Sequence, residues 1–370
     1  MSSAVRSGRL YIGLMSGTSL DGVDAVVGDF SPSQPRFIAH SHRAFTPELR
    51  DQLLRLTTRG DDEIERSGMA AQHLARTYAA AVNDLLLEAG ISAKDVQAIG
   101  AHGQTLRHRP EHGFTVQLNA PALLAELTGI AVVADFRSRD LAAGGHGAPL
   151  VPAFHAAVFS SQQPRAVVNI GGISNISFLP AQGGEGQVFG FDCGPGNLLL
   201  DAWAALHLGT PYDADGAWGA SGKVDSALLA RLQTDAFFSA PPPKSTGREL
   251  FDLGWLRLHM KDEAAADVQA SLVALTASGI ADAIERWCPQ AEEVLVCGGG
   301  AYNGALMREL DRRCSPRSVA STAQAGLAPE HVEAFAFAWL AHAHLSRQAG
   351  NLPAVTGARG PRILGALYPA

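Results

Sequence analysis

The stretch RLYIGLMSGTSLDGVDAVV at residues 9–27 decides the fold. In it an apolar strand leads into a turn of Gly, Ser and Thr, and a second apolar strand follows. The stretch RAVVNIGGISNISFL at residues 165–179 has the same design. Two matching hairpins predict two related halves of the chain, although a coincidence between two ordinary hairpins also explains the pattern.

Strand-like and helical runs alternate along the rest of the chain. Val, Ile and Phe are frequent in the predicted strands at 10–15, 23–30, 96–101, 130–136, 166–170, 173–179 and 294–297. Apolar residues recur at helical spacing over 47–57, 61–89, 120–128, 197–207, 267–287, 303–313 and 329–348. This alternation predicts an α/β fold. Segments 180–187 and 239–249 are rich in Gly, Pro and Ser, which predicts loops.

Length and composition predict two well-packed domains. A chain of 370 residues favours two domains, and we place the boundary between residues 1–133 and 134–370, with part of the C-terminal helix packing back on the first domain. Only 18% of the residues are charged and 46% are hydrophobic, which excludes a mainly disordered chain. The 39 glycines exceed the usual share of about 7%, which predicts tight turns or close approaches to a ligand.

Charge and cysteine content indicate a cytoplasmic protein. The chain has 29 basic and 36 acidic residues and no basic block, which disfavours a nucleic-acid partner. Its first residues lack the apolar region of a signal peptide, and no apolar run approaches the length of a membrane span. The four cysteines have no C-x-x-C spacing, so we expect reduced thiols.

The two Gly-rich turns are candidates for phosphate binding, because such turns bring several backbone N–H groups to one point. An ordinary P-loop is excluded, since Val224 follows Gly222-Lys223 where Ser or Thr is needed. The run GGGAYN at 298–303 misses G-x-G-x-x-G at its last position. A phosphate site would therefore use the two turns and the cluster at 298–300, and the alternative is a purely structural role for the hairpins.

Four carboxylates are candidates for chemistry, each with a structural alternative. Asp192, in GFDCGPGNLLLDAW directly after a short strand, is expected to be either a helix cap or a general base at the mouth of a cleft. Glu333 lies in an apolar helical run, either on an exposed face or in a cleft. Asp21 and Asp24 flank the first turn and are suited either to Mg²⁺ or its waters, or to turn formation.

Polar residues in two further segments are candidates for binding a ligand. Arg137 precedes the turn GGHG at 144–147, and a guanidinium there suits a carboxylate or phosphate, unless the loop is merely solvated. His102 and Gln104 follow a predicted strand, where α/β proteins place ligands.

His108 and His112 have the spacing of a zinc pair, but Pro110 breaks the helix that zinc would need, so we reject a zinc site.

These segments together resemble the 1,6-anhydro-N-acetylmuramic acid kinase family. The matching runs, in chain order, are IGLMSGTSLDGVD, GAHGQTLRH, ADFRSRDLAAGGHGAPLVP, NIGGISNIS, GFDCGPGN, PPPKSTGRE, LVCGGGAYN and TGARGPRILGALYP. They extend from about Tyr11 to Pro369. One departure is Cys193, where the pattern of the family has Thr, and its lost hydroxyl puts a minor contact in doubt.

The resemblance implies two RNase H-like domains of the sugar kinase, Hsp70 and actin type around an active-site cleft. It assigns the ATP phosphates to the turns, with Ser16, Gly17, Thr18, Ser19, Asp21, Gly22, Gly171, Gly172, Ser174 and Asn175. It assigns the nucleoside to Gly298, Gly299, Gly300 and Asn303. It assigns the sugar to His102, Gln104, Arg137, Asp192 and Glu333. Mg²⁺ is expected on the ATP phosphates, with Asp21 or Asp24 contributing through water, and a homodimer is expected.

The activity that the resemblance implies is ATP-dependent opening of the 1,6-anhydro bridge with phosphorylation of O6. The products are N-acetylmuramic acid 6-phosphate and ADP, in the recycling of cell-wall sugars. Asp192 is expected to activate water, Glu333 to orient the sugar or the water, and Arg137 to bind the lactyl carboxylate. The alternatives are a kinase for a free sugar hydroxyl and a non-catalytic nucleotide switch resembling Hsp70 or actin.

Overall fold

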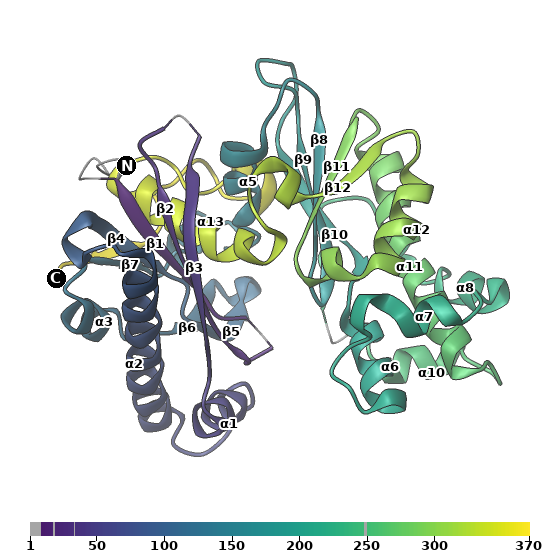
Figure 1. The fold of residues 1–370 in the computed structure, drawn as a ribbon, viewed down its shortest axis with the longest axis horizontal. Coiled ribbons are helices and arrows are strands. Elements are labelled where there is room, and N and C mark those ends of the chain that lie inside the picture. Colours follow the sequence, from purple (N-terminus) through teal and green to yellow (C-terminus); the bar gives the residue numbers. More distant parts are fainter. Residues whose placement is uncertain (1–8, 18, 33, 248–249) are drawn as a thin grey trace. The chain divides into compact units, whose positions relative to one another are not determined.

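The computed structural model describes residues 9–17, 19–32, 34–247 and 250–370. Thr18, one of the expected phosphate-binding residues, lies outside these ranges. The chain divides into two compact units: unit 1 comprises Met1–Val158 and His331–Ala370, and unit 2 comprises Phe159–Glu330 (Figure 1). Among the described residues, no helix is both long and apolar enough to cross a membrane.

The sheet of unit 1 is built around its first strand. Its order is β13 (Ala366–Tyr368), β7 (Val132–Ala134), β4 (Val96–Ala101), β1 (Leu10–Met15), β2 (Gly22–Asp29) and β3 (Arg36–Ala44). Strands β1, β2 and β3 form an antiparallel meander, whereas β4 runs parallel to β1 and β7 parallel to β4. A separate hairpin joins β5 (Gln104–Arg109) to β6 (Phe114–Leu118).

Two helices cover opposite faces of this sheet, because successive side chains of a strand point to opposite sides. Leu14 lies in the core with Leu74 of α2 (Glu63–Ala89), whereas Tyr11 contacts His342 of α13 (Val332–Leu345). The other helices of unit 1 are α1 (Pro47–Leu56), α3 (Pro121–Thr128), α4 (Ser138–Ala142) and α14 (Pro353–Thr356), and α5 (Val151–Phe159) ends at the division between the units.

Unit 2 has a sheet of the same plan. Its order is β10 (Phe189–Pro195), β9 (Ile173–Leu179), β8 (Arg165–Ile170), β11 (Glu293–Cys297) and β12 (Ser318–Ser321). Its helices are α6 (Leu198–Leu208), α7 (Ala217–Ser221), α8 (Ser226–Leu232), α9 (Ala236–Ser239), α10 (Leu253–His259), α11 (Ala265–Trp287) and α12 (Gly304–Cys314). Most residues of the long helix α11 are buried, and nine of them belong to the apolar core that covers β8, β9 and β10.

The two sheets therefore share one topology. In each, an antiparallel meander of three strands is extended beyond its first strand by two parallel strands, as β3-β2-β1-β4-β7 and as β10-β9-β8-β11-β12. This is the RNase H-like plan, so the α/β fold expected from the sequence is confirmed. The paired hairpins are the first two strands of two related units rather than a coincidence.

Every predicted strand and helix is present, but the structure has further elements and a different boundary. The unexpected elements are the strands β3, β5, β6, β12 and β13 and the helices α4, α5, α7, α8, α9, α10 and α14. The compact units divide at residues 158 and 159, not at 133 and 134. Residues 134–158 belong to unit 1 because they pack within it: Arg137 bonds to His102, and Phe154 contacts Phe335 of α13.

Glycines allow α13 to lie directly against the sheet of unit 1. A Cβ added at Gly13 would lie 1.9 Å from the carbonyl oxygen of Ala334, and one added at Gly100 would lie 2.0 Å from that of Phe337. Both obstacles are backbone atoms of α13, so no side chain can rotate to make room. The close approach therefore needs glycine at both positions.

Replacing Gly13 with Ala should destabilise the protein by about 3 kcal/mol or more, since α13 has to shift away from β1. Gly68→Ala is the matched control: Gly68 is an exposed residue of α2 with no atom within 4 Å of an added Cβ. That change should stabilise the protein by about 0.5–1 kcal/mol through helix propensity. Urea unfolding of both variants measures the difference, and equal stabilities would contradict the role of Gly13.

Candidate active site

The first turn follows β1 and is tied to the fold by buried side chains. Ser16 is only 1% exposed, and its hydroxyl lies 2.7 Å from that of Tyr78 and donates to the carbonyl of Gly103 at 3.2 Å. Burial raises the pKa of Tyr78, so its hydroxyl stays protonated. Gln104 donates from Nε2 to the carbonyl of Gly17 at 3.1 Å. These hydrogen bonds therefore hold the backbone of the turn in place.

His102 is a neutral link between this turn and Arg137. A guanidinium can only donate, so the contact of 3.1 Å from Arg137 makes Nε2 of His102 the acceptor. Nδ1 then carries the proton and donates to the carbonyl of Ser16 at 3.3 Å. Burial, reinforced by the charge of Arg137, lowers the pKa of His102 to about 3. The imidazole is thus fixed in one tautomer and takes no part in proton transfer near neutral pH.

Arg137 lies between His102, the GGHG turn and Glu333. It also donates to the carbonyl of Gly147 at 2.9 Å. Burial lowers its pKa to about 10, a shift that the charge of Glu333 opposes, so the guanidinium is charged at neutral pH. Glu333 lies in the first turn of α13, where the helix dipole favours a carboxylate. Unit 1 thus brings together three of the expected sugar-binding residues: His102, Arg137 and Glu333.

Asp140, two residues after α4 begins, anchors the GGHG turn. Its side chain is fully buried and accepts hydrogen bonds from the backbone N–H of Gly147 at 2.8 Å, Thr356 Oγ1 at 2.7 Å and Asn351 Nδ2 at 2.6 Å. The turn is therefore held to the C-terminal segment of the chain. The segment that carries Arg137 and the GGHG turn is therefore packed into the fold and is not a solvated loop.

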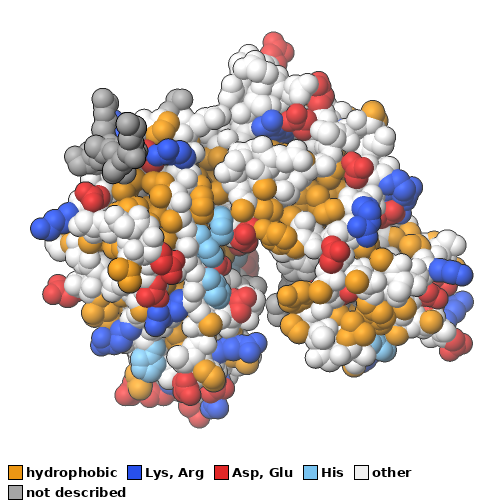
Figure 2. All heavy atoms as spheres, in the orientation of Figure 1, with side chains coloured by type: hydrophobic (Ala, Val, Ile, Leu, Met, Phe, Trp, Pro, Cys, Tyr) orange, Lys and Arg blue, Asp and Glu red, His pale blue; other side chains and the backbone are white. Residues whose placement is uncertain are grey.

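The carboxylates that flank the first turn are used within the fold. Asp21 Oδ1 accepts a hydrogen bond from Ser19 Oγ at 2.8 Å, as a turn-forming residue does. Asp24 Oδ1 lies 3.2 Å from His40 Nε2 and 2.9 Å from His42 Nδ1. Burial raises the pKa of Asp24, but the two imidazoles outweigh it and hold the pKa below its ordinary value. Histidines gather on one face of unit 1 (Figure 2).

Asp24 therefore has two histidine partners within the fold, and its approach to Mg²⁺ stays a prediction. The described residues contain no group of three or more His, Cys, Asp and Glu side chains suited to a metal ion.

The second turn, between β8 and β9, is locked to the start of α6. The carbonyl of Gly172 accepts from the N–H groups of Gly196 and Leu198, and the carbonyl of Gly171 accepts from that of Asn197, at 2.8–3.0 Å. A trans peptide places its N–H opposite its C=O. The N–H groups of Gly172 and Ile173 consequently point away from α6.

This second turn also leaves room beside its backbone. A Cβ added at Gly171 would meet nothing closer than 3.7 Å, and one at Gly172 nothing closer than 3.9 Å. Packing therefore does not demand glycine there, and an open backbone is the arrangement that an anion needs. Ser174 does not share this openness, because its buried hydroxyl donates to the carbonyl of Gly194 at 3.1 Å. Asn175 lies opposite Asp192 in the sheet.

Asp192 lies within β10 and is not a helix cap. Helix α6 begins only at Leu198, and Asn197 is its cap residue. A β-bulge at Cys193 interrupts the pairing of β10 with β9 directly after Asp192. Bulges commonly redirect side chains next to active sites. The N–H of Asp192 donates to the carbonyl of Lys244 at 3.1 Å, and its Oδ2 accepts from the N–H of Thr246 at 2.9 Å.

Cys193 replaces the expected Thr without leaving an empty place. Its Sγ donates to the carbonyl of Ser174 at 3.3 Å, a bond that a Thr hydroxyl can also make. The residue is buried in the apolar core of unit 2, and burial raises the pKa of its thiol to about 12. The departure at this position therefore affects the core and not a ligand contact.

The third glycine cluster is partly structural. A Cβ at Gly298 would lie 2.4 Å from Asn169 Oδ1, and one at Gly300 would lie 2.3 Å from Ile170 Cγ2, so both glycines allow close packing on β8. Gly299 has room, with Asn197 Nδ2 nearest at 3.5 Å. Asn303 caps α12, accepting from the N–H of Leu306 at 3.0 Å.

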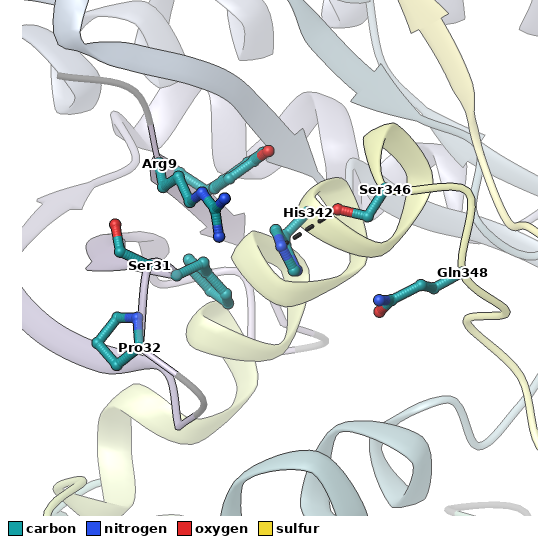
Figure 3. Close-up of a pocket in the computed structure, with 8 residues that line it drawn as sticks. Arg9, Ser31, Pro32, His342, Ser346 and Gln348 are labelled. Carbon is teal, nitrogen blue, oxygen red and sulfur yellow. Dashed lines mark hydrogen bonds between the residues drawn. The ribbon is translucent and has the colours of Figure 1, made fainter.

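Each unit has a pocket on its surface. One of about 470 Å³ lies at the start of β1, lined by Arg9, Tyr11, Phe30, His342, Ser346 and Gln348, among others (Figure 3). Ser16 follows the other end of β1, so none of the expected site residues lines this pocket. A second pocket of about 320 Å³ in unit 2 has small apolar walls, including Ala270, Ala274 and Ala305, and the charged side chains of Arg308, Glu309 and Arg312.

Sequence reasoning missed the residues that hold Asp192. Lys244 and Thr246 lie in the run PPPKSTGRE, which lacks periodicity and reads as a loop. Tyr78, which supports Ser16, lies inside a long amphipathic helix and reads as a core residue. No local pattern marks these contacts, because they join segments more than fifty residues apart.

Two units of the RNase H-like plan, each with a short turn after its first strand, form the fold that sugar kinases share with Hsp70 and actin. A family model described as anhydro-N-acetylmuramic acid kinase matches residues 9–370. The chain belongs to that family.

Curated relatives with this name match nearly end to end. The anhydro-N-acetylmuramic acid kinase of Variovorax paradoxus is 54% identical over 374 residues, covering 98% of this chain and all of the relative. That of Bordetella petrii is 56% identical over 371 residues, covering 98% and 97%. Among solved structures, the activator of the 2-hydroxyisocaproyl-CoA dehydratase from Clostridium difficile aligns with a TM-score of 0.47 at 12% identity, covering 91% and 97%.

The neutral state of His102 predicts a pH dependence of stability. A histidine whose pKa is lower in the fold than in the unfolded chain favours folding above about pH 6.5, and this contribution is lost as the pH falls toward 3. The free energy of unfolding of the wild type should therefore fall faster below pH 6 than that of His102→Gln. The two slopes should differ by about 1.4 kcal/mol per pH unit.

Urea unfolding of both proteins at pH 7, 6 and 5 measures this difference. Burial also lowers the pKa of His155 to about 3, but that residue is common to both proteins and cancels. Parallel curves would show that His102 is protonated in the fold.

Proposed function

We propose that this protein transfers the γ-phosphoryl group of ATP to O6 of 1,6-anhydro-N-acetylmuramic acid while water opens the anhydro bridge. The products are N-acetylmuramic acid 6-phosphate and ADP. Membership of the family supports the substrate and the reaction. The observation that carries the mechanism is the carboxylate of Asp192, which lies at a bulge in β10, has no capping role and is fixed by the N–H of Thr246.

The second turn suits the phosphates of ATP. The N–H groups of Gly172 and Ile173 point away from α6, and the backbone of Gly171 and Gly172 is open to a group that approaches it. Backbone N–H groups gathered in this way stabilise phosphate oxygens. Mg²⁺ on the phosphates would neutralise the charge that develops during phosphoryl transfer.

The nucleoside has a candidate site beside α12. The walls of the 320 Å³ pocket in unit 2 are small and apolar, which suits a flat base, and Arg308 and Arg312 add donors at its edge. The pocket is next to Asn303, because Ala305 lines it. Gly299 is the residue of the third cluster that leaves room for a ligand. These features support the nucleoside assignment made from the sequence.

In the proposed reaction Asp192 takes a proton from water, and the water oxygen forms a bond to the anomeric carbon. The bond from that carbon to O6 breaks, and O6 bonds to the γ-phosphorus as the bond to the bridging oxygen of ADP breaks. General-base assistance of this kind is worth about 10²–10⁴-fold. The attack by water opposite the departing oxygen resembles that in an inverting glycosidase.

The residues of unit 1 are proposed to bind the sugar. Arg137 presents a charged guanidinium whose orientation is set by His102 and by the carbonyl of Gly147. Such a group suits the lactyl carboxylate of the substrate. Glu333, close enough to Arg137 to influence its pKa, is proposed to orient the sugar or the water. His102 acts through Arg137 and is a positioning residue.

We propose that the protein works in the cytoplasm. All four cysteines are buried thiols outside any disulfide, which suits a reducing compartment. A homodimer is expected from the resemblance to the family. Gel filtration with light scattering measures the oligomeric state directly.

Asp192→Asn should abolish sugar phosphorylation, because the amide cannot accept the proton of water, while ATP binding stays nearly unchanged. Release of ADP with anhydro-N-acetylmuramic acid measures turnover, and calorimetry measures ATP binding. Asp311→Asn, which changes an exposed carboxylate of unit 2, is the matched control and should keep wild-type activity. Full activity of Asp192→Asn would overturn the assignment.

Reaction in ¹⁸O-water tests the coupling of the two bond changes. The label should appear at C1 of the product and not in its phosphate. Label in inorganic phosphate would indicate ordinary hydrolysis of ATP, and activity on the open-ring sugar alone would indicate a kinase for a free hydroxyl. Consumption of ATP without added sugar would indicate a nucleotide switch.

A further inference from the structure

Two hydrogen bonds join the segment at 241–247 to Asp192, one donated in each direction. The N–H of Asp192 donates to the carbonyl of Lys244, and the N–H of Thr246 donates to Asp192 Oδ2. The segment is itself anchored, because Nζ of Lys244 donates to the carbonyl of Phe237 at 2.9 Å and lies 4.6 Å from the centre of its ring. Thr246 is therefore held in a fixed place beside the carboxylate.

The hydroxyl of Thr246 is buried and, across the described ranges, makes no hydrogen bond. Buried hydroxyls in native proteins are nearly always paired, so an unpaired one beside a candidate base indicates a missing ligand or water. Three covalent bonds join Oγ1 to the amide nitrogen that contacts Oδ2, so the two oxygens are at most about 6.5 Å apart. One water bridges them when their separation is about 5.5 Å or less.

We propose that Thr246 is a further catalytic residue, whose hydroxyl accepts a hydrogen bond from the water that Asp192 deprotonates. This inference rests on the proposed function. One hydrogen of the water passes to the Asp192 carboxylate, and the other stays bonded to oxygen and points at Oγ1 of Thr246. Both hydrogens are then fixed, so a lone pair of the water is directed at the anomeric carbon as the bond from that carbon to O6 breaks.

Neighbouring groups do not offer the same contact. Cys193 is buried in the core of unit 2, where its thiol donates to the carbonyl of Ser174. Ser245 is exposed to solvent. Thr246 is therefore the hydroxyl of this segment that is both buried and next to the carboxylate.

Thr246→Val tests the inference, because it keeps the shape and the backbone N–H but removes the hydroxyl. The kcat with anhydro sugar should fall on the order of 10- to 100-fold with little change in KM, as expected for one lost hydrogen bond in the transition state. Thr246→Ser keeps a hydroxyl and should retain most of the activity. Ser245→Ala is the matched control and should behave as wild type.

A partition experiment separates this role from a structural one. Methanol has a single O–H, which passes to Asp192, so Thr246 assists water but not methanol. In a fixed mixture of methanol and water, Thr246→Val should form several-fold more methyl glycoside 6-phosphate relative to the free sugar phosphate than wild type does, a shift set by the loss of one hydrogen bond.

Three results would overturn the inference: wild-type kcat in Thr246→Val, equal losses in the Val and Ser variants, or an unchanged partition ratio. If Thr246→Val does not fold, Thr246→Ala is measured in the same way against Thr246→Ser. This test is separate from the test of Asp192 as the general base. Full activity of Asp192→Asn removes the proposed mechanism, whereas a normal partition ratio in Thr246→Val removes only the role of Thr246.

Discussion

The close approach of α13 to the sheet is the constraint on which unit 1 depends. Gly13 on β1 and Gly100 on β4 place the backbone of the helix where a single methyl group would collide with it, and Gly28 on β2 accommodates Phe335 in the same way. Since Gly13 meets Ala334, in the first turn of the helix, this packing fixes the start of α13. The packing of Gly13 against Ala334, an uncharged contact, therefore holds Glu333 close to Arg137.

Polar side chains at the ends of the strands mostly bind the protein itself. Ser16, Gln104 and Ser174 all use their side chains on backbone carbonyls of neighbouring segments. His102 also makes its contacts within the protein. Burial and the charge of Arg137 lower its pKa, so the imidazole is neutral. Backbone N–H groups and the side chain of Arg137 are the groups that we propose for ligand binding. A charged phosphate suits such a site because rigid dipoles need no reorganisation to stabilise it.

The elements that the sequence predicts well are those with strong local periodicity. Both hairpins, the parallel strands β4 and β11, and the helices α2, α11 and α13 each carry an apolar pattern that burial requires. The strand β3 has the sequence RFIAHSHRA and is mostly half-buried or exposed, so no such pattern identifies it. The short strand β13 forms only by pairing with β7, which is more than two hundred residues earlier. Such elements depend on tertiary contacts.

The same distinction applies to the site. The sequence predicts Asp192 and Arg137 as candidates, because their neighbours form recognisable motifs. It does not predict Thr246 or Tyr78, whose contacts join distant segments of the chain. It also treats all glycine clusters alike, whereas the structure separates them. Gly13, Gly298 and Gly300 allow backbone or side chains to pack closely, and Gly171, Gly172 and Gly299 leave space beside them.

That separation sharpens the meaning of the glycine excess. A glycine whose missing Cβ is filled by the protein contributes to folding, and its replacement should lower stability whether or not a ligand is bound. Packing gives no reason for a glycine beside open space, so where its φ is also ordinary, as at Gly171 and Gly172, a group that approaches the backbone supplies one. Gly171 and Gly172 meet this second condition next to N–H groups that face away from α6. Of the glycine clusters, the second turn therefore makes the strongest physical case for binding phosphate.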